Sequence, residues 1–454
     1  MRKYFGTDGI RRIANTELSP NLVYRVAKAG AYVLSKHTDK APTILIGRDT
    51  RLSGTLIESA MVSGFLSYGA NVKLLGVMPT PAVAYLTRKL QADASVVISA
   101  SHNTFEFNGI KYFSNKGMKI LDEIEEEIEE VMDSGKLDEL SAVSEKIGVS
   151  EIRTDLLDEY VYFFRKNFDD NIEKYNRPDF KVVIDTANGA TYKVAENVFS
   201  ALGINHVIIN NNPDGININA GCGSTHLEML KKYVVENKMN LGIAYDGDGD
   251  RCLAVDENGN EIDGDKLLAI IGQYLRKKGK LSKDTIVATV MSNLGLNKYA
   301  EQNGLQLIQT KVGDRYVLEE MLKNGYNLGG EQSGHVILLD YNPTGDGILT
   351  SLMLIQAILE SGKKASELSG VMKKYPQVLI NAKVNSNKKY DYEKNTEIKS
   401  AIEKLEKEFS GNGRVLIRPS GTEPLVRVMI EGQDKDAIEL EAKKLCELIE
   451  KYCK

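Results

Sequence analysis

The chain has 454 residues, of which 58 are basic and 63 acidic, so its formal net charge is −5. This length is enough for three or four domains, and the charges lack the basic cluster that nucleic-acid binding requires. The longest apolar stretches are strand-sized and the chain opens on Met1 to Phe5, so we expect no membrane span, no signal peptide and a cytoplasmic protein. We expect four free thiols, at Cys222, Cys252, Cys446 and Cys453.

Three successive regions alternate β-rich runs with amphipathic helical stretches, which is the pattern of parallel βαβ units. In the first region we expect helices at 52–68 and 81–90 and strands at 43–46, 71–75 and 94–99. The second and third regions are expected to contain strands at 181–185, 206–209, 241–245, 285–290, 306–309 and 335–339. The acidic stretch 122–132 is interpreted as a solvated helix face that closes the first region.

The last part of the chain departs from this pattern after breaks at 361–364 and 375–376. It is expected to contain a strand at 378–384, a charged helix at 390–409, strands around Ile417 and Val428, and a closing helix at 435–451. The fold class is therefore α/β, with three tandem mixed domains of mostly parallel sheets and a smaller α+β C-terminal domain. The expected domains are 1–150, 151–255, 256–366 and 367–454, and we expect the last to be the mobile one.

Ser101 follows an apolar strand and lies near His102, Asn103 and Lys111 in the sequence. We expect an exposed hydroxyl in a polar loop with donors around it, which can carry a phosphoryl group. Taken alone, such a serine is more often a helix cap or a loop hydroxyl. A serine hydrolase is disfavoured because no Gly-x-Ser-x-Gly elbow surrounds it.

Three aspartates alternate with glycines directly after the strand at 241–245, and Arg251 follows them: Asp246, Asp248 and Asp250. Three hard oxygen ligands on a glycine-hinged loop are typical of a Mg²⁺ site, and without a cation they would repel one another. With Glu257 they also match an EF-hand, but Arg251 takes the position that needs glycine and the flanks are strands. A metal beside a phosphoserine and an arginine indicates phosphoryl transfer.

Two further loops are candidates for substrate binding. Segment 418–424, Arg-Pro-Ser-Gly-Thr-Glu-Pro, combines hydroxyls, a flexible glycine and guanidinium groups, and suits a phosphate, although an ordinary hairpin turn is the alternative. Segment 329–335, Gly-Gly-Glu-Gln-Ser-Gly-His, suits sugar hydroxyls. Arg11 is expected to face the phosphoserine, whereas Arg48 and Arg51 are expected to be ion-pair partners of the scaffold.

Six stretches in this order resemble the α-D-phosphohexomutase superfamily over essentially the whole chain: 6–11, 47–51, 99–103, 246–251, 330–335 and 418–424. Gln332 and the run 219–226 resemble its bacterial phosphoglucosamine mutase branch. The superfamily has four domains, the first three alike, around a central cleft. The chain departs from the common pattern at Arg12, Thr104 and Phe107, and these departures leave the nucleophile and the metal ligands intact.

The resemblance implies an isomerase that interconverts glucosamine 6-phosphate and glucosamine 1-phosphate for amino-sugar precursors of the bacterial cell wall. Phosphorylated Ser101 would pass its phosphoryl group to the sugar, giving a sugar bisphosphate whose other phosphate returns to Ser101. One Mg²⁺ per chain would be held by Ser101, Asp246, Asp248 and Asp250. Catalysis is assigned to Ser101, Lys111 (proton transfer), His102, Arg11 and Arg251, and substrate binding to Glu331, Ser333, His335, Lys311, Arg418, Ser420, Gly421, Thr422 and Arg427.

Alternative functions stay open at this point. The nearest is a phosphomannomutase/phosphoglucomutase, and those of another class are a Mg²⁺-dependent sugar phosphatase or a non-catalytic sugar-phosphate-binding protein. The intact Ser101 argues against a non-catalytic protein, and a distal phosphate cradle is superfluous for simple hydrolysis. The expected partner is a small sugar phosphate, with neither nucleic acid nor membrane, bound to a monomer or homodimer.

Overall fold

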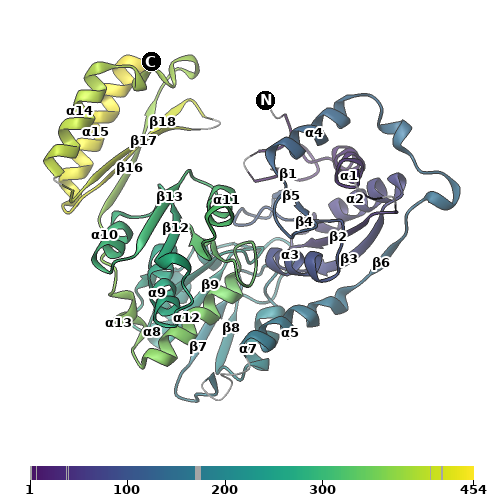
Figure 1. Ribbon diagram of the computed structural model, residues 1–454, viewed down its shortest axis with the longest axis horizontal. Helices are drawn as coiled ribbons and strands as arrows, with labels where there is room; N and C mark the ends of the chain where they lie inside the picture. Colours follow the sequence, from purple (N-terminus) through teal and green to yellow (C-terminus); the bar gives the residue numbers. More distant parts are fainter. Residues whose placement is uncertain are drawn as a thin grey trace. The chain divides into compact units, whose positions relative to one another are not determined.

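The computed structural model describes residues 3–6, 8–36, 38, 40–168, 175–409, 411–420 and 423–454 (Figure 1). The chain divides into two compact units, one of residues 1–290 and 308–371 and the other of residues 291–307 and 372–454. Its described strands form sheets of six, five, four and three strands in chain order. The predicted fold class is confirmed, because helices alternate with strands in the first three sheets and the last sheet is small and antiparallel.

The first sheet has the strand order β1-β5-β4-β2-β3-β6, and its strands are β1 (Ile10–Ile13), β2 (Thr43–Arg48), β3 (Asn71–Val77), β4 (Ala94–Ile98), β5 (Phe107–Ser114) and β6 (Ser150–Ile152). Its helices are α1 (Pro20–Leu34), α2 (Gly54–Tyr68), α3 (Thr80–Lys89) and α4 (Asp122–Asp133). All five residues of β4 are buried, as expected for a central strand covered on both faces. Strand β5 runs antiparallel to β4 and pairs Lys111 with Val97.

Helix α4 is only partly solvated, which corrects the interpretation of its acidic residues. Glu125 and Glu129 are buried. The Glu129 carboxylate accepts hydrogen bonds from three successive backbone N–H groups at the start of the described chain, those of Lys3, Tyr4 and Phe5, at 2.6 to 2.7 Å. The acidic helix therefore anchors the chain next to β1.

The second sheet, β11-β10-β9-β7-β8, contains β7 (Val182–Asp185), β8 (His206–Ile209), β9 (Leu241–Tyr245), β10 (Cys252–Asp256) and β11 (Glu261–Ile262), with helices α5 (Leu157–Phe168), α7 (Val194–Ala201) and α8 (Glu228–Glu236). The third, β13-β12-β14-β15, contains β12 (Thr285–Thr289), β13 (Gln306–Thr310), β14 (Leu328–Gly330) and β15 (Val336–Leu338), with α9 (Gly264–Lys277), α11 (Asp314–Asn324), α12 (Gly347–Ser361) and α13 (Ala365–Ser369). Strands β9 and β10 are antiparallel neighbours, so the loop between them is short.

The second unit contains the antiparallel sheet β16-β18-β17, with β16 (Gln377–Lys383), β17 (Arg414–Pro419) and β18 (Leu425–Glu431), and the helices α10 (Leu294–Gln302), α14 (Thr396–Phe409) and α15 (Lys435–Cys453). Helices α14 and α15 lie side by side along this sheet (Figure 1). The predicted start of the charged helix at residue 390 is wrong. The Asn395 side chain accepts a hydrogen bond from the backbone N–H of Ile398 at 3.1 Å, and the helix begins there.

Helix α10 is tied to the last sheet by the buried carboxylate of Glu431. This carboxylate accepts hydrogen bonds from Asn293 Nδ2 at 3.0 Å and from the backbone N–H of Leu294 at 3.2 Å. It is also paired with Arg414 at 2.6 Å. The segment before α10 and the C-terminal sheet are therefore parts of one compact unit, although about 140 residues separate them in sequence.

All four cysteines are buried free thiols, as predicted. Among the residues that the structure describes, no helix combines the length and apolar character that a membrane crossing needs.

Candidate active site

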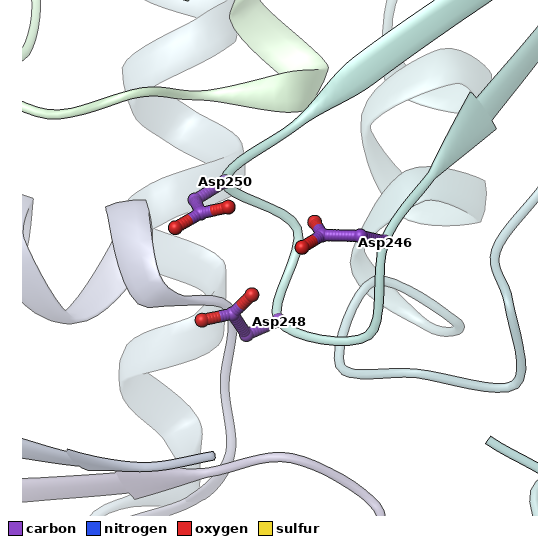
Figure 2. Close-up of side chains that lie close together, drawn as sticks. All are labelled: Asp246, Asp248 and Asp250. Carbon is purple, nitrogen blue, oxygen red and sulfur yellow. The ribbon is translucent and has the colours of Figure 1, made fainter. Parts of the chain in front are cut away.

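The loop between β9 and β10 gathers three carboxylates from alternate positions (Figure 2). Asp246, Asp248 and Asp250 are all buried, and one ligand atom from each lies within 4.8 Å of the others. Glycines at 247 and 249 separate them, and Gly249 adopts a left-handed φ of 74° that lets the chain turn back into β10. Strands on both sides of the loop exclude an EF-hand, which requires helices.

The three aspartates fit a divalent cation. Burial and the negative charges of Asp250 and Asp248 raise the pKa of Asp246 well above its usual range, although the Arg251 charge opposes this shift. The Oδ1 atoms of Asp248 and Asp250 are buried and accept no hydrogen bond from the described residues. Buried carboxylate oxygens that accept no hydrogen bond are the ligands that Mg²⁺ and Ca²⁺ prefer.

Ser101 lies in the loop after β4, against the aspartate cluster. Its Oγ donates a hydrogen bond to Asp246 Oδ2 at 2.6 Å and lies 3.4 Å from Nδ1 of His102. The expectation of an exposed hydroxyl is wrong, because Ser101 is only 1% exposed. The strand exit turns inward onto the metal loop, and Ser101 adopts a left-handed φ of 50°.

Arg51 fixes this loop from behind, as the scaffold interpretation predicts. Its guanidinium pairs with Asp49 at 2.8 Å, with both side chains fully buried, and its Nη2 donates to the carbonyl oxygens of Ser101 and Asn103 at 2.9 and 2.8 Å. Arg48 pairs instead with Glu58 at 3.3 Å. Neither arginine therefore offers its charge to a substrate in this arrangement.

Lys111 brings a positive charge to the aspartates from the buried strand β5. Its Nζ lies 2.9 Å from Asp248 Oδ2, 3.3 Å from Asp8 Oδ2 and 3.7 Å from Asp250 Oδ2. Burial opposes the charge, but these carboxylates outweigh it and raise the pKa of Lys111, so the amine is protonated at neutral pH. The sequence placed Lys111 near Ser101 but did not predict β5, because buried polar residues interrupt its apolar pattern.

Arg11 and Asp8 complete this side of the site. Arg11 Nη1 donates to Asn103 Oδ1 and its Nη2 pairs with Asp8, both at 2.9 Å, so Arg11 lies beside the Ser101 loop, and its contact with a phosphate on Ser101 stays a prediction. Asp8 was not among the predicted site residues, although it lies within the stretch 6–11. A signal in the sequence could have identified Asp8, because it lies between Gly6 and Gly9 and is followed closely by the cation Arg11.

His102 is neutral at physiological pH. Burial and the positive charges of Arg251 and Arg11 lower the pKa of this imidazole to about 4. A neutral ring next to Ser101 Oγ can position the oxygen or exchange a proton with it.

A pocket of about 210 Å³ lies beside the aspartate cluster and receives residues from the β14–β15 turn, including Glu331 and His335. His335 Nδ1 lies 3.6 Å from Asp250 Oδ2, and Glu331 Oε1 accepts a hydrogen bond from the backbone N–H of Gly313 at 3.2 Å. Arg251 also lines this pocket. Three of the predicted residues are thus brought together next to the metal loop.

Two predicted sugar-binding residues do not line this pocket, whereas several residues that do line it had not been predicted. Ser333 and Lys311 are exposed, and the Lys311 ammonium lies over the ring of Tyr316. Lys119 and Asp314 do line the pocket and are paired at 2.6 Å. They were missed because neither lies in a glycine-rich motif, and only the packing of α11 near the end of β5 makes them neighbours.

The predicted phosphate loop lies in the second unit, between β17 and β18. The register of these strands places Arg418 opposite Arg427, and burial together with the neighbouring Arg427 charge lowers the pKa of Arg418. Ser420 is buried, and its Oγ accepts a hydrogen bond from the backbone N–H of Glu423 at 3.2 Å. Gly421 and Thr422 lie outside the described residues. Two adjacent guanidinium groups suit an anion.

Models of the phosphoglucomutase/phosphomannomutase family match four successive parts of the chain. The α/β/α domains I, II and III match residues 2–139, 158–259 and 263–375, and the C-terminal domain matches residues 379–448.

Two bacterial phosphoglucosamine mutases are similar over the full length. That of Ruminiclostridium cellulolyticum is 56% identical over 450 residues, which cover 99% of each chain. That of Clostridium tetani is 52% identical over 454 residues, which cover 100% of each chain. A solved phosphoglucomutase/phosphomannomutase family protein from Burkholderia thailandensis is 22% identical and has the same fold, with a TM-score of 0.79 over 99% of this chain and 98% of the other.

Proposed function

Because the chain belongs to the phosphoglucomutase/phosphomannomutase family, we propose that it interconverts glucosamine 6-phosphate and glucosamine 1-phosphate. It is an isomerase of the phosphohexomutase type. The names of relatives that share 52% and 56% of their residues with this chain support the amino sugar as substrate. A phosphorylated sugar does not cross membranes unaided, which is consistent with a cytoplasmic enzyme.

The observation that carries this proposal is the contact between Ser101 and the aspartate cluster. Ser101 Oγ lies 2.6 Å from Asp246, one of three buried carboxylates with room for a cation. A phosphate on this oxygen would place its own oxygens at the cluster. A simple hydroxyl nucleophile would need a strong neighbouring base, whereas a phosphoserine needs positive charge and accurate positioning.

Asp246, Asp248 and Asp250, together with the phosphate on Ser101, would hold one Mg²⁺. When bound, this ion neutralises phosphoryl oxygens and makes the phosphorus more electrophilic. The protein supplies further positive charge through Lys111, 3.3 Å from Asp8, and through Arg11 beside Asn103.

In the first transfer, a sugar hydroxyl oxygen forms a bond to phosphorus and the bond between phosphorus and Ser101 Oγ breaks. The Ser101 oxygen gains a proton from the Lys111 ammonium, and the amine that results takes the proton that the sugar hydroxyl loses, so no proton is gained or lost overall. Lys111 is protonated, so we assign it the donor role, and we assign His102 to the orientation of Oγ. The resulting sugar bisphosphate returns its other phosphate to Ser101 by the reverse steps, which regenerates the phosphoenzyme.

Substrate recognition is divided between two loops. Glu331 and His335 line the pocket beside the metal loop and suit sugar hydroxyl or amino groups. Arg418, Ser420 and Arg427 suit the phosphate that is not reacting, because they combine two guanidinium groups with a hydroxyl. A phosphate held by these residues would stay bound while the bisphosphate reorients, which is the role expected of the predicted lid domain 367–454.

Substrate profiling of the purified protein tests the proposal. Glucosamine, glucose and mannose phosphates would each be assayed with Mg²⁺ and the matching sugar bisphosphate, and peptide mass spectrometry would locate the phosphate. We expect the highest kcat/KM with glucosamine phosphate and a phosphate on Ser101. A higher kcat/KM with mannose or glucose phosphate would favour the phosphomannomutase/phosphoglucomutase activity, and release of inorganic phosphate alone would favour a phosphatase.

A further inference from the structure

Asn219 reaches the Ser101 loop from the second sheet, where it follows β8 in the chain. It is 3% exposed, and its Nδ2 lies 2.9 Å from the carbonyl oxygens of both Ser101 and Asn103. Its Oδ1 accepts no hydrogen bond from the described residues, so Asn219 contacts the loop only as a donor, through Nδ2. Arg51 donates to the same two carbonyl oxygens from the first sheet. The loop is thus held by two side chains from two sheets.

The conformation of Ser101 requires such support. Its φ of 50° lies in the left-handed region, which residues with a side chain rarely adopt. Two carbonyl groups two residues apart also present their oxygens to the same side. Hydrogen-bond donors on that side offset the repulsion between the oxygens and stabilise the strained turn.

The metal loop packs against the Ser101 carbonyl oxygen and the Asn219 amide nitrogen. A Cβ atom at Gly247 would lie 2.6 Å from the Ser101 carbonyl oxygen and 2.8 Å from Asn219 Nδ2, so only glycine fits there. Gly247 is the residue between Asp246 and Asp248. Any shift of the Asn219 amide therefore moves the surface on which both the nucleophile loop and the metal loop rest.

We infer that Asn219 is a positioning residue, whose amide sets the register between the Ser101 nucleophile and the metal-binding carboxylates. This inference rests on the proposed mutase function. Asn219 does not touch the reacting atoms. It acts through the Ser101 and Asn103 carbonyls, and misplacement of a reacting group by about 1 Å can lower a rate about a hundredfold.

Two substitutions separate the amide from the shape of the side chain. Asn219 itself has a left-handed φ of 58°, which glycine adopts without strain, so Asn219→Gly removes the donor and keeps the backbone. Asn219→Asp keeps the shape but directs a carboxylate oxygen at two carbonyl oxygens. The matched control is Asn210→Gly, because Asn210 also has a left-handed φ, of 51°, and its side chain interacts with Met229 and Asp185 instead of the Ser101 loop.

The full chain with Mg²⁺ would be used for kcat, KM, melting temperature and amide hydrogen exchange of residues 99–104. We expect kcat to fall about tenfold to a hundredfold in Asn219→Gly and further in Asn219→Asp, with KM within about twofold. Exchange in residues 99–104 should be faster in both variants, and Asn210→Gly should match wild type.

A side chain that only fills space gives the opposite order, with Asn219→Asp close to wild type. That order, or a kcat of Asn219→Gly within about twofold of wild type, overturns the inference, as does a loss of activity that only follows a lower melting temperature. If the wild type prefers another hexose phosphate, the proposed substrate fails, and the same series is read on that sugar. If it has no mutase activity, hydrogen exchange still decides whether Asn219 fixes the loop.

Discussion

Replacing Asp248 by asparagine changes one atom of the metal loop. Asp248 Oδ2 accepts hydrogen bonds from Lys111 Nζ at 2.9 Å and Thr80 Oγ1 at 2.8 Å, whereas Oδ1 has no partner among the described residues. Both donors require an oxygen, so in Asp248→Asn the amide nitrogen takes the Oδ1 position. The substitution therefore removes one negative charge and the oxygen that is available to a cation.

This geometry gives the expected change in the free energy of unfolding and in the stabilisation by bound Mg²⁺. The hydrogen bond from Lys111 loses its charged acceptor, which lowers the free energy of unfolding by about 1 to 2 kcal/mol. Lys111 keeps Asp8 and Asp250 at 3.3 and 3.7 Å, so the protein should still fold. Mg²⁺ at a hundred times its Kd stabilises the wild type by about 2.7 kcal/mol, and a variant that binds about a hundredfold more weakly gains only about 0.4 kcal/mol.

Urea unfolding with and without Mg²⁺ measures this difference for wild type, Asp248→Asn and a control. The control is Asp284→Asn, which removes the same charge from a half-exposed carboxylate 3.2 Å from Arg276. We expect wild type and control to gain equally from Mg²⁺. The reasoning is refuted if Mg²⁺ stabilises Asp248→Asn as much as wild type, because the aspartate cluster would then not be the Mg²⁺ site.

Three further predictions concern other parts of the molecule. Ser101→Ala should carry no phosphate at this position by peptide mass spectrometry and should lose mutase activity; near-normal turnover would contradict the phosphoserine mechanism. Arg427→Ala should lower kcat/KM about ten- to two-hundredfold, the loss of one charged hydrogen bond of about 1.5 to 3 kcal/mol, while the exposed-pair control Arg153→Ala stays near wild type. Glu129→Gln should lower the free energy of unfolding in urea by about 1 to 3 kcal/mol, because an amide group replaces one of the two oxygens that accept backbone N–H groups; an unchanged midpoint would show that the anchor contributes nothing.

The sequence predicted the features that depend on local patterns. Apolar runs located β4 and β9, and glycine spacing located the aspartates at the end of β9, because both signals lie within a few residues. The scaffold ion pair of Arg51 was predicted, but the contacts of Arg51 and Asn219 with the Ser101 loop could not be predicted in this way. Their partners on the Ser101 loop lie about 50 and 120 residues away in the chain, so only the packed sheets bring them together.

Strand β5 and the start of α14 were missed for different physical reasons. Strand β5 buries polar Asn108 and charged Lys111, whose cost is met by tertiary partners that no periodicity reveals. The residues before α14 have helical composition, but the side chain of Asn395 caps the helix and thereby sets its first turn. Ser101 was expected to be exposed because loops usually are, whereas this loop is covered by the metal loop.

The attachment of α10 to Glu431 has a consequence for recombination between relatives. The family's C-terminal domain model covers residues 379–448, and an exchange of that segment alone would replace Arg414 and Glu431 while it keeps Asn293 and Leu294 from the other parent. A parent without a carboxylate at position 431 would remove the acceptor of the buried Leu294 N–H group, which typically costs about 1 to 3 kcal/mol. Chimeras of this family should therefore take residues 291–307 and residues 372–454 from the same parent, because these two segments form one compact unit.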